Sequence, residues 1–408
     1  MTKTITFIRH AESTGNHEGL WQGHTDTSLS ETGLDQISIL AAALGTQHFD
    51  EIITSDLARA RQTADAIGGG TPDDRWRELA LGDFEGLSTR EIGERYPDVL
   101  EAMAAGDDFA IPGGESVEGF LERLDVAFEE LVEALAEGSR AVVVTHGGVI
   151  RTIASRVLGV GDGFAPIQVP MNTSLTRILI DDEGRRLQVY NDATHLAESV
   201  ADARWPGTNV YLFRHGQTEA NLTRRWQGRG DSSLTETGRH QATLLADAFP
   251  SMDRLMVSPA GRARDTARAV AQRHGHEVQL IDDLVEMDFG EWENKTAEEA
   301  EALHPEQFDL IYRQGVDIQR GLNGESFAEA GIRLADAIAA AVEEHRGERI
   351  GMVTHGGAAR AYVAHVLGMD FASRERLPVL RNTARARVLY RDHRPRLAEY
   401  NVAPHLED

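Results

Sequence analysis

Cysteine is absent from this sequence of 408 residues. Its absence excludes disulfide bonds, thiolate metal sites and thiol catalysis. Long apolar runs are also missing: the best are as short as Ala141–Val144, whereas a membrane helix needs about 20 apolar residues. Residues 1–8 read as the start of a strand and lack the pattern of a secretory leader. We therefore expect a soluble, cytoplasmic protein.

Positive charge is scarce. The chain has 41 Lys and Arg against 66 Asp and Glu, a formal net charge of −25. Nucleic-acid binding needs a basic surface, so we expect no such partner. A small anion remains acceptable, because charges are screened over about 8 Å at physiological salt and a few pocket arginines outweigh a distant acidic surface. The 16 histidines form no His-Glu-x-x-His motif, and we expect no metal and no cofactor.

The chain contains two copies of one sequence unit. The same landmarks recur in the same order, 203 to 210 residues apart. They include Arg9-His10 and Arg214-His215, Ser55…Arg59-Ala60 and Ser258…Arg262-Ala263, and Thr145-His146-Gly147-Gly148 and Thr354-His355-Gly356-Gly357. A duplicated domain with small loop insertions explains this. We expect domains over residues 1–199 and 208–408, packed on each other, and a linker over 200–207 that contains Pro206-Gly207.

Strand-like and helix-like stretches alternate within each unit, as in residues 4–8, 31–44, 52–54 and 57–67. This order predicts an α/β fold: two tandem three-layer α/β/α domains, each with a mostly parallel central sheet flanked by helices. The spacing of Leu34, Ile37, Ala41 and Leu44 predicts the buried face of the first helix. Ser28 and Glu31, repeated as Ser233 and Glu236, resemble a capping box at its start.

Two histidines of each unit follow strand-like stretches. His10 comes after residues 4–8, and His146 lies at the carboxyl end of the strand that contains the apolar run Ala141–Val144. Ligands of open α/β sheets bind at the carboxyl ends of the strands. The two imidazoles are therefore expected to converge at one edge of the sheet.

Each residue alone has an ordinary structural explanation; His146-Gly147-Gly148, for example, could be only a tight turn. The combination is different. Arg-His, Ser-x-x-x-Arg-Ala, a glutamate before Gly-x-x-Glu, and Thr-His-Gly-Gly occur in order and twice. Over nearly all of both halves the chain resembles the histidine phosphatase superfamily, the group that includes the cofactor-dependent phosphoglycerate mutases.

That resemblance implies a role for each matching residue of the first unit. His10 would be the nucleophile that becomes phosphorylated, and Glu78 would be the proton donor. The others would surround the phosphoryl group: Arg9 and Arg59 as a clamp, His146 completing the pocket, and Ser13 and Asn16 adding contacts. The matching residues of the second unit are His215, Glu286, Arg214, Arg262, His355, Thr218 and Asn221.

The chemistry suits these residue types. Guanidinium groups make paired, charge-assisted bonds to phosphoryl oxygens. An imidazole with a reference pKa of about 6.5 is largely neutral at neutral pH and can attack phosphorus.

Arg59 and Arg262 are expected in the first turn of a helix, while Arg61 and Arg264 should face solvent. Glu85, Glu291 and Glu293 are alternative acids, expected to be exposed and therefore weaker candidates, and Trp21 and Trp226 fit either the pocket or the core.

A phosphomonoesterase of small phosphorylated metabolites is the favoured function. Only 68 residues separate Glu78 from His146, which resembles the shorter phosphatase members of the family. A phosphoglycerate mutase-type phosphotransferase is second, and a phospho-ligand-binding module with one inactive domain is a distant third. Residues 89–111 are acidic, whereas the second unit carries Arg313 and Arg320 in this region, so the units could differ in substrate. The oligomeric state stays open.

Overall fold

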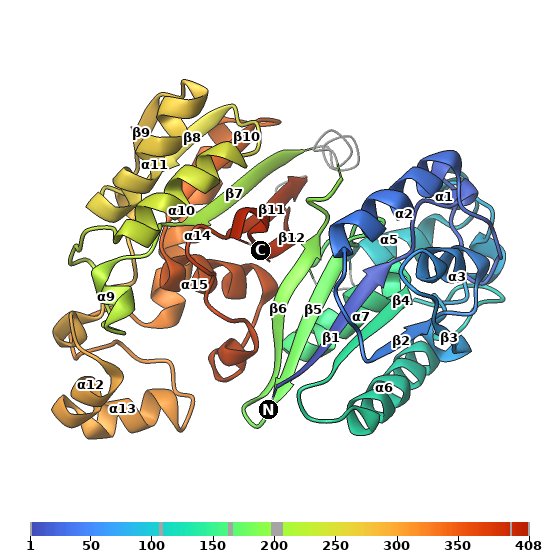
Figure 1. Ribbon diagram of the computed structural model, residues 1–408, viewed down its shortest axis with the longest axis horizontal. Helices are drawn as coiled ribbons and strands as arrows, with labels where there is room; N and C mark the ends of the chain where they lie inside the picture. The colour runs from blue at the N-terminus through green and yellow to red at the C-terminus, as the bar shows by residue number, and fades with distance from the viewer. Residues whose placement is uncertain (1, 106–108, 162–165, 197–206, 392–393, 407–408) are drawn as a thin grey trace. The chain divides into compact units, whose positions relative to one another are not determined.

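The computed structural model describes residues 2–105, 109–161, 166–196, 207–391 and 394–406. The chain divides into two compact units, Met1–Ala201 and Asp202–Asp408, coloured blue to green and green to red in Figure 1. The proposed linker, residues 200–207, lies outside the described residues except for Gly207. Within the described part of the chain, no helix combines the length and the apolar character needed to cross a membrane.

Unit 1 is built on a mostly parallel sheet in the order β3-β2-β4-β1-β5-β6. Strands β1 to β4 are parallel, and β5 and β6 run antiparallel to their neighbours. The strands are β1 Lys3–Arg9, β2 Glu51–Thr54, β3 Thr71–Pro72, β4 Arg140–Thr145, β5 Leu175–Asp181 and β6 Gly184–Asp192. The helices are α1 Thr14–His17, α2 Glu31–Leu44, α3 Ala58–Asp65, α4 Thr89–Arg95, α5 Pro97–Ala105, α6 Val117–Ala134 and α7 Gly147–Leu158.

Unit 2 repeats this arrangement in the order β9-β8-β10-β7-β11-β12, parallel from β9 to β7 and antiparallel over β11 and β12. Its strands are β7 Thr208–Arg214, β8 Arg254–Val257, β9 Val278–Leu280, β10 Arg349–Thr354, β11 Arg385–Arg391 and β12 Arg394–Val402. Its helices are α9 Glu219–Leu222, α10 Glu236–Asp247, α11 Gly261–His274, α12 Ala297–Leu303, α13 Pro305–Tyr312, α14 Phe327–Glu344, α15 Gly356–Leu367 and the 3₁₀ helix η5 Phe371–Arg376.

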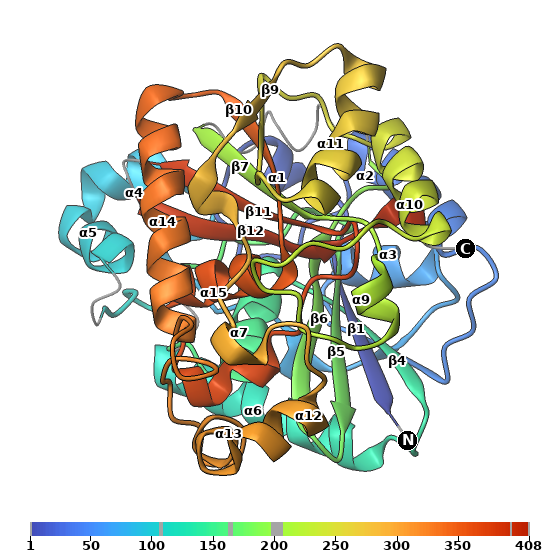
Figure 2. The same cartoon turned by 90° about the vertical axis from the view of Figure 1, so that its left-hand side faces the viewer.

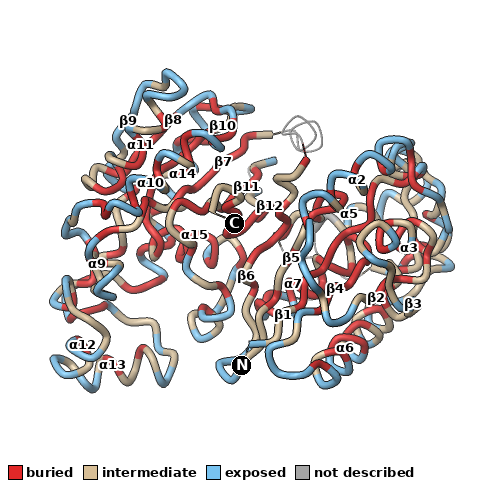
Figure 3. Tube along the Cα trace, viewed as in Figure 1, coloured by how far each residue is buried: buried red, intermediate tan, exposed pale blue. Residues whose placement is uncertain are grey.

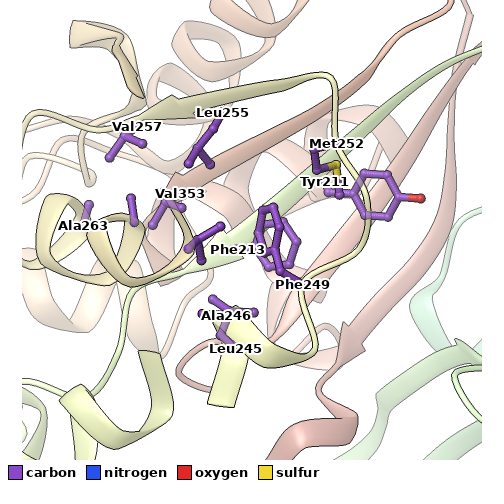
Figure 4. Packing of buried hydrophobic residues seen from close by; sticks show 12 residues of the cluster. Tyr211, Phe213, Leu245, Ala246, Phe249, Met252, Leu255, Val257, Ala263 and Val353 are labelled. Atoms are coloured by element: carbon purple, nitrogen blue, oxygen red, sulfur yellow. The ribbon is translucent and has the colours of Figure 1, made fainter. Parts of the chain in front are cut away.

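Helices cover both faces of each sheet, which confirms the three-layer prediction. In unit 2, α10 and α11 lie on one side of the strands and α14 on the other (Figure 2). Phe213 and Val353 of the strands pack with Leu245 of α10 and Ala263 of α11 (Figure 4). The central strands are almost wholly buried (Figure 3), as expected of parallel strands covered on two faces.

The first long helix occupies the predicted range, Glu31–Leu44, but its start and its buried face differ from the prediction. The cap is Ser30, whose hydroxyl accepts the N–H of Gly33; Thr235 does the same in unit 2, so the capping boxes predicted at Ser28 and Ser233 are wrong. Leu34 is 54% exposed. The helix instead turns Gly33 inward, where a Cβ would lie 2.0 Å from the carbonyl oxygen of Glu12, so close backbone contact sets its orientation.

Candidate active site

Four histidines meet in pairs at the carboxyl edges of the two sheets. In unit 1, parallel pairing of β1 with β4 places His10 beside His146, and the ring centroids lie 5.1 Å apart. In unit 2 the same pairing of β7 with β10 brings His215 and His355 to 5.3 Å. The predicted convergence of the imidazoles is confirmed in both units.

The first histidine of each pair is held in one tautomer. His10 Nδ1 lies 2.7 Å from the carbonyl oxygen of Ala11, and His215 Nδ1 lies 2.7 Å from that of Gly216. A carbonyl only accepts hydrogen bonds, so each Nδ1 carries the proton. The lone pair is then on Nε2, and in unit 2 Arg262 Nε donates to this atom at 3.3 Å. A neutral imidazole with a directed lone pair is a competent nucleophile.

One arginine of each unit enters the site from the first turn of a helix, as predicted. Arg59, the second residue of α3, is 1% exposed and donates from its two terminal nitrogens to the carbonyl oxygens of Thr25 and Gly23, each at 2.8 Å. Its Nε is buried and has no hydrogen-bond partner among the described residues. In unit 2 the matching bonds join Arg262 to the carbonyl oxygens of Gly230 and Gly228, at 2.7 and 2.9 Å.

The loop that supplies these carbonyls is fixed by a carboxylate. Glu85 accepts the N–H groups of His24 and Thr25 at 2.8 and 2.6 Å, and Glu293 accepts those of Arg229 and Gly230 in unit 2. Burial alone would raise the pKa of Glu85, but these bonds and the Thr25 hydroxyl hold it below its usual value. Glu85 and Glu293 are partly buried, contrary to the expectation of exposure, and they position the loop that holds Arg59 and Arg262.

A second arginine is the last residue of the first strand of each unit. Arg9 and Arg214 each donate from one terminal nitrogen, to the carbonyl oxygens of Pro170 and Leu380, at 2.7 Å. Arg214 Nε is buried without a partner among the described residues. Arg61 and Arg264 are exposed, as predicted.

The second histidine of each pair is bonded to a serine that the sequence did not single out for this contact. His146 Nε2 lies 2.8 Å from Ser55 Oγ, and His355 Nε2 lies 2.7 Å from Ser258 Oγ. The Nδ1 atoms of both histidines are buried without a partner in the described part of the chain. If the serine hydroxyl donates to Nε2, then Nδ1 carries the proton and can donate to an anion.

Burial lowers the pKa of three of these histidines well below the usual value. For His146 and His355 the cause is first desolvation, then the neighbouring charges, of which Arg59 and Arg262 respectively are the strongest. For His215 the cause is desolvation and then Arg214 and Arg262. These imidazoles are therefore neutral near neutral pH, and the cationic neighbours favour an incoming anion.

The glutamates implied as proton donors accept hydrogen bonds at the amino ends of α7 and α15. Glu78 accepts the N–H of Gly148 at 2.8 Å, and Glu286 accepts that of Gly357 at 3.0 Å. A Cβ on Gly148 would lie 2.2 Å from a Glu78 carboxylate oxygen. Neither Gly147 nor Gly148 has a positive φ. The Gly-Gly pair is therefore not an unusual turn, and its lack of side chains admits the glutamate.

Ser13 and Thr218 are fully buried N-caps, and their hydroxyls accept the N–H of Asn16 and Asn221. A further asparagine in each unit, which the sequence did not single out, holds Asn16 and Asn221. Asn172 donates to the carbonyl oxygen of His10 at 2.8 Å and to Asn16 Oδ1 at 3.2 Å. Asn382 makes the matching bonds in unit 2. The repeated Asn-Thr pairs, Asn172-Thr173 and Asn382-Thr383, were the signal that could have found them.

Each site thus presents a fixed imidazole, a second imidazole, two guanidinium groups and a carboxyl around one position. Among the described residues, no three His, Asp or Glu side chains are arranged to hold a metal ion. The donors are nitrogen atoms of cationic or neutral groups, which bind an anion of several oxygens rather than a cation.

Comparison with known proteins gives two matches along the chain. A profile of the histidine phosphatase superfamily, branch 1, matches residues 5–193 and again residues 210–403. "Phosphoglycerate mutase-like protein 4" of Arabidopsis thaliana is 33% identical over 205 residues, which is 48% of this chain and 87% of the relative. "Metal-independent phosphoserine phosphatase" of the same plant is 34% identical, over 38% of this chain and 66% of the relative.

Among solved structures, a phosphoserine phosphatase of Entamoeba histolytica in complex with phosphoserine is 29% identical. The alignment covers 49% of this chain and 100% of that protein, with a TM-score of 0.45.

Proposed function

Because this chain belongs to the histidine phosphatase superfamily, we propose that each unit is a metal-independent phosphomonoesterase that hydrolyses small phosphorylated metabolites through a phosphohistidine. The observation that carries this proposal is the fixed tautomer of His10 and His215, since Nδ1 bonded to a carbonyl leaves Nε2 as the only nucleophilic nitrogen. Both units have it. We therefore assign an active site to each.

In the first step His10 Nε2 attacks phosphorus and the bond to the ester oxygen breaks. Glu78 gives its proton to that oxygen, so that an alcohol leaves. Arg9, Arg59 and His146 Nδ1 donate to the phosphoryl oxygens, on which negative charge is spread in the transition state. The product is a phosphohistidine at His10.

In the second step a water molecule attacks the phosphohistidine. Glu78, now ionised, takes a proton from this water, and the bond between phosphorus and Nε2 breaks. Phosphate leaves, and His10 returns to its neutral form. Unit 2 follows the same course with His215, Glu286, Arg214, Arg262 and His355.

The phosphoglycerate mutase reaction is the second candidate, favoured by the similarity to a phosphoglycerate mutase-like protein. The two reactions differ in the acceptor, which is water or a bound phosphoglycerate. The deciding experiment supplies the chain with a labelled phosphate ester, with and without unlabelled phosphoglycerate, and follows the label. We expect it in inorganic phosphate. Label in the phosphoglycerate would favour the mutase, and no turnover of any ester in a broad panel would contradict both.

A further inference from the structure

Three arginines of unit 2 that play no part in the phosphate cluster lie beside the aromatic rings of Phe371, Tyr312 and Phe327. The Cζ atoms of Arg320 and Arg374 lie 4.8 and 3.8 Å from the ring centroid of Phe371, and Arg374 also lies 5.6 Å from that of Tyr312. Arg360 donates to the carbonyl oxygen of Arg374. All three arginines are buried: Arg320 is 2% exposed, Arg374 6% and Arg360 9%. They come from three segments, the loop before α14, η5 and α15.

This cluster has more positive than negative charge. Asp317 pairs with Arg320 at 2.7 Å, and Glu375 is shared by Arg360 and Arg374 at 3.0 and 3.1 Å. The Glu375 side chain is 65% exposed, so solvent weakens its contribution. The Nε atoms of Arg320 and Arg360 are buried without a hydrogen-bond partner in the described residues.

The charges around Arg374 also show an excess of positive charge in this cluster. Its pKa is lowered, first by burial and then by the positive charges of Arg360 and Arg320, while Glu375 acts in the opposite direction. Buried cations with unused donors are costly unless an anion pairs with them. Three cations and two carboxylates leave one positive charge, which matches a ligand carboxylate.

The cluster adjoins the phosphate site. Arg360 lies in the second turn of α15, and the first turn of this helix donates to Glu286. Arg320 precedes Gly321, whose carbonyl accepts the N–H of Glu291 in the loop after Glu286. Tyr312 stacks on Trp226 at 5.8 Å, and the chain continues from Trp226 to the Gly228 carbonyl that holds Arg262. Stacked rings therefore connect Arg374 with the loop whose carbonyls hold Arg262.

Unit 1 lacks most of this cluster. Pro112 accepts the N–H of Asp83 as Gly321 accepts that of Glu291, so Ile111 stands where unit 2 has Arg320. Arg151 matches Arg360 in position on the helix after the second histidine. Between Gly161 and Ile167, the stretch that corresponds to η5, the sequence has no arginine or lysine. Unit 1 thus keeps one of the three arginines.

We propose that unit 2 acts on a phosphate monoester that also carries a carboxylate, which Arg320, Arg360 and Arg374 bind, and that unit 1 has no such requirement. This inference rests on the proposed phosphatase function of both units. The aromatic side chains around the arginines exclude water and strengthen their bonds to the ligand carboxylate.

The test uses the full chain with one unit silenced. His10→Ala leaves unit 2 active, and His215→Ala leaves unit 1 active. Each variant is assayed on 3-phosphoglycerate and on glycerol 3-phosphate, which has a hydroxymethyl group in place of the carboxylate, and on 4-nitrophenyl phosphate. We expect kcat/KM of the His10→Ala chain to favour 3-phosphoglycerate by about 10- to 100-fold. The His215→Ala chain should not favour it.

Arg320→Ile copies unit 1 into unit 2 and should reduce the preference of the His10→Ala chain at least several-fold. Arg313→Ala is the matched control, because Arg313 pairs with Glu301 and Asp309 on the surface and should leave the preference unchanged. If Arg320→Ile does not fold, as judged by thermal unfolding, the two silenced chains decide the question.

Equal preference in the two silenced chains would overturn this inference and leave the phosphatase assignment standing. Failure of both chains to hydrolyse any of the three esters would overturn the phosphatase assignment, and the inference with it.

Discussion

The two units agree around the phosphate position and differ beside it. The paired histidine rings lie 5.1 Å apart in unit 1 and 5.3 Å apart in unit 2, and each first histidine is bonded to the next carbonyl at the same 2.7 Å. Next to these sites, Ile111 is replaced by Arg320. His24, whose ring bonds the Glu78 carbonyl oxygen, is replaced by Arg229, which pairs with Asp288 and Glu325.

This difference separates two demands on the fold. Phosphoryl transfer fixes the direction of every donor, so the arginines, histidines and glutamate keep their geometry in both copies. The organic part of the ester makes no such demand, and the residues that would face it have changed in charge. A duplicated chain can therefore keep one chemistry and serve two substrates.

Loss of both nucleophiles should have the largest effect. The double variant His10→Ala, His215→Ala should lose phosphatase activity by at least about 1000-fold, since the remaining histidine of each pair has its Nε2 bonded to a serine and does not replace the nucleophile. Each single variant should retain the activity of the other unit. Turnover of 4-nitrophenyl phosphate measures this, and a single variant as inactive as the double would show that the two sites are not equivalent.

The second-largest loss of activity should follow from replacing Arg59 or Arg262, the arginines in the first turn of α3 and α11. Arg59→Met in the His215→Ala chain, and Arg262→Met in the His10→Ala chain, should each reduce kcat/KM by about 100- to 1000-fold, because a buried donor to the transition state is lost. Lysine should not restore activity, because its single nitrogen cannot reproduce the separate guanidinium nitrogens that bind the two loop carbonyls and the phosphoryl group. Arg61→Ala and Arg264→Ala, two residues further along the same helices and exposed, are the controls and should behave as the parent chains.

Alanine at the second glycine of the Gly-Gly pair, Gly148 or Gly357, should reduce kcat more in unit 1 than in unit 2. Gly148→Ala places Cβ 2.2 Å from a Glu78 carboxylate oxygen, whereas Gly357→Ala leaves 2.7 Å to Glu286. Measured in the His215→Ala chain for Gly148→Ala and in the His10→Ala chain for Gly357→Ala, kcat should fall by about 10- to 100-fold, more in unit 1, because the displaced acid no longer meets the leaving group. Gly93→Ala meets only an ordinary contact at 3.5 Å and should leave activity intact. Equal activity of all three variants would contradict the role of the Gly-Gly pair.

Acid should destabilise the fold through the buried histidines. The pKa values of His146, His215 and His355 are lowered in the folded state, so the unfolded chain binds more protons than the folded chain below its own histidine pKa of about 6.5. Their contribution to stability is present above that pH and is lost as pH falls below it. Each group adds a slope of up to about 1.4 kcal/mol per pH unit. Denaturant unfolding between about pH 8 and pH 5 measures it, and saturating phosphate, which favours the protonated ring, should flatten it.

Much of the site could be predicted from the sequence, because its residues follow recognisable strands or begin helices. The convergence of His10 with His146, the first-turn position of Arg59 and the exposure of Arg61 were all predicted and are confirmed. These depend on local periodicity and on one topological rule, that parallel strands end at the same edge.

The missed features depend on contacts between distant segments. Ser55 bonds a histidine 91 residues away, and its role cannot be read from its neighbours in sequence. The capping serine was misplaced by two positions because Ser28 and Glu31 match the capping-box spacing, whereas Glu31 is the first residue of α2 and Ser30 precedes it. The buried face was misplaced because Gly33 contacts the Glu12 carbonyl, which the apolar pattern does not show. From the sequence, Glu85 is only an alternative proton donor. Its bonds to the N–H groups of His24 and Thr25 join residues 61 and 60 positions apart, so its role in holding that loop cannot be read from its neighbours.

The central claim is that each unit passes phosphate through its first histidine, and trapping the intermediate tests it most directly. The chain is mixed rapidly with a labelled phosphate ester, quenched in alkali to preserve phosphohistidine, digested and mapped by mass spectrometry. We predict label on His10 and on His215 only, and loss of each label in the matching alanine variant. Label on any other residue, or turnover of the ester without a phosphohistidine at either position in the rapidly quenched samples, would contradict the account.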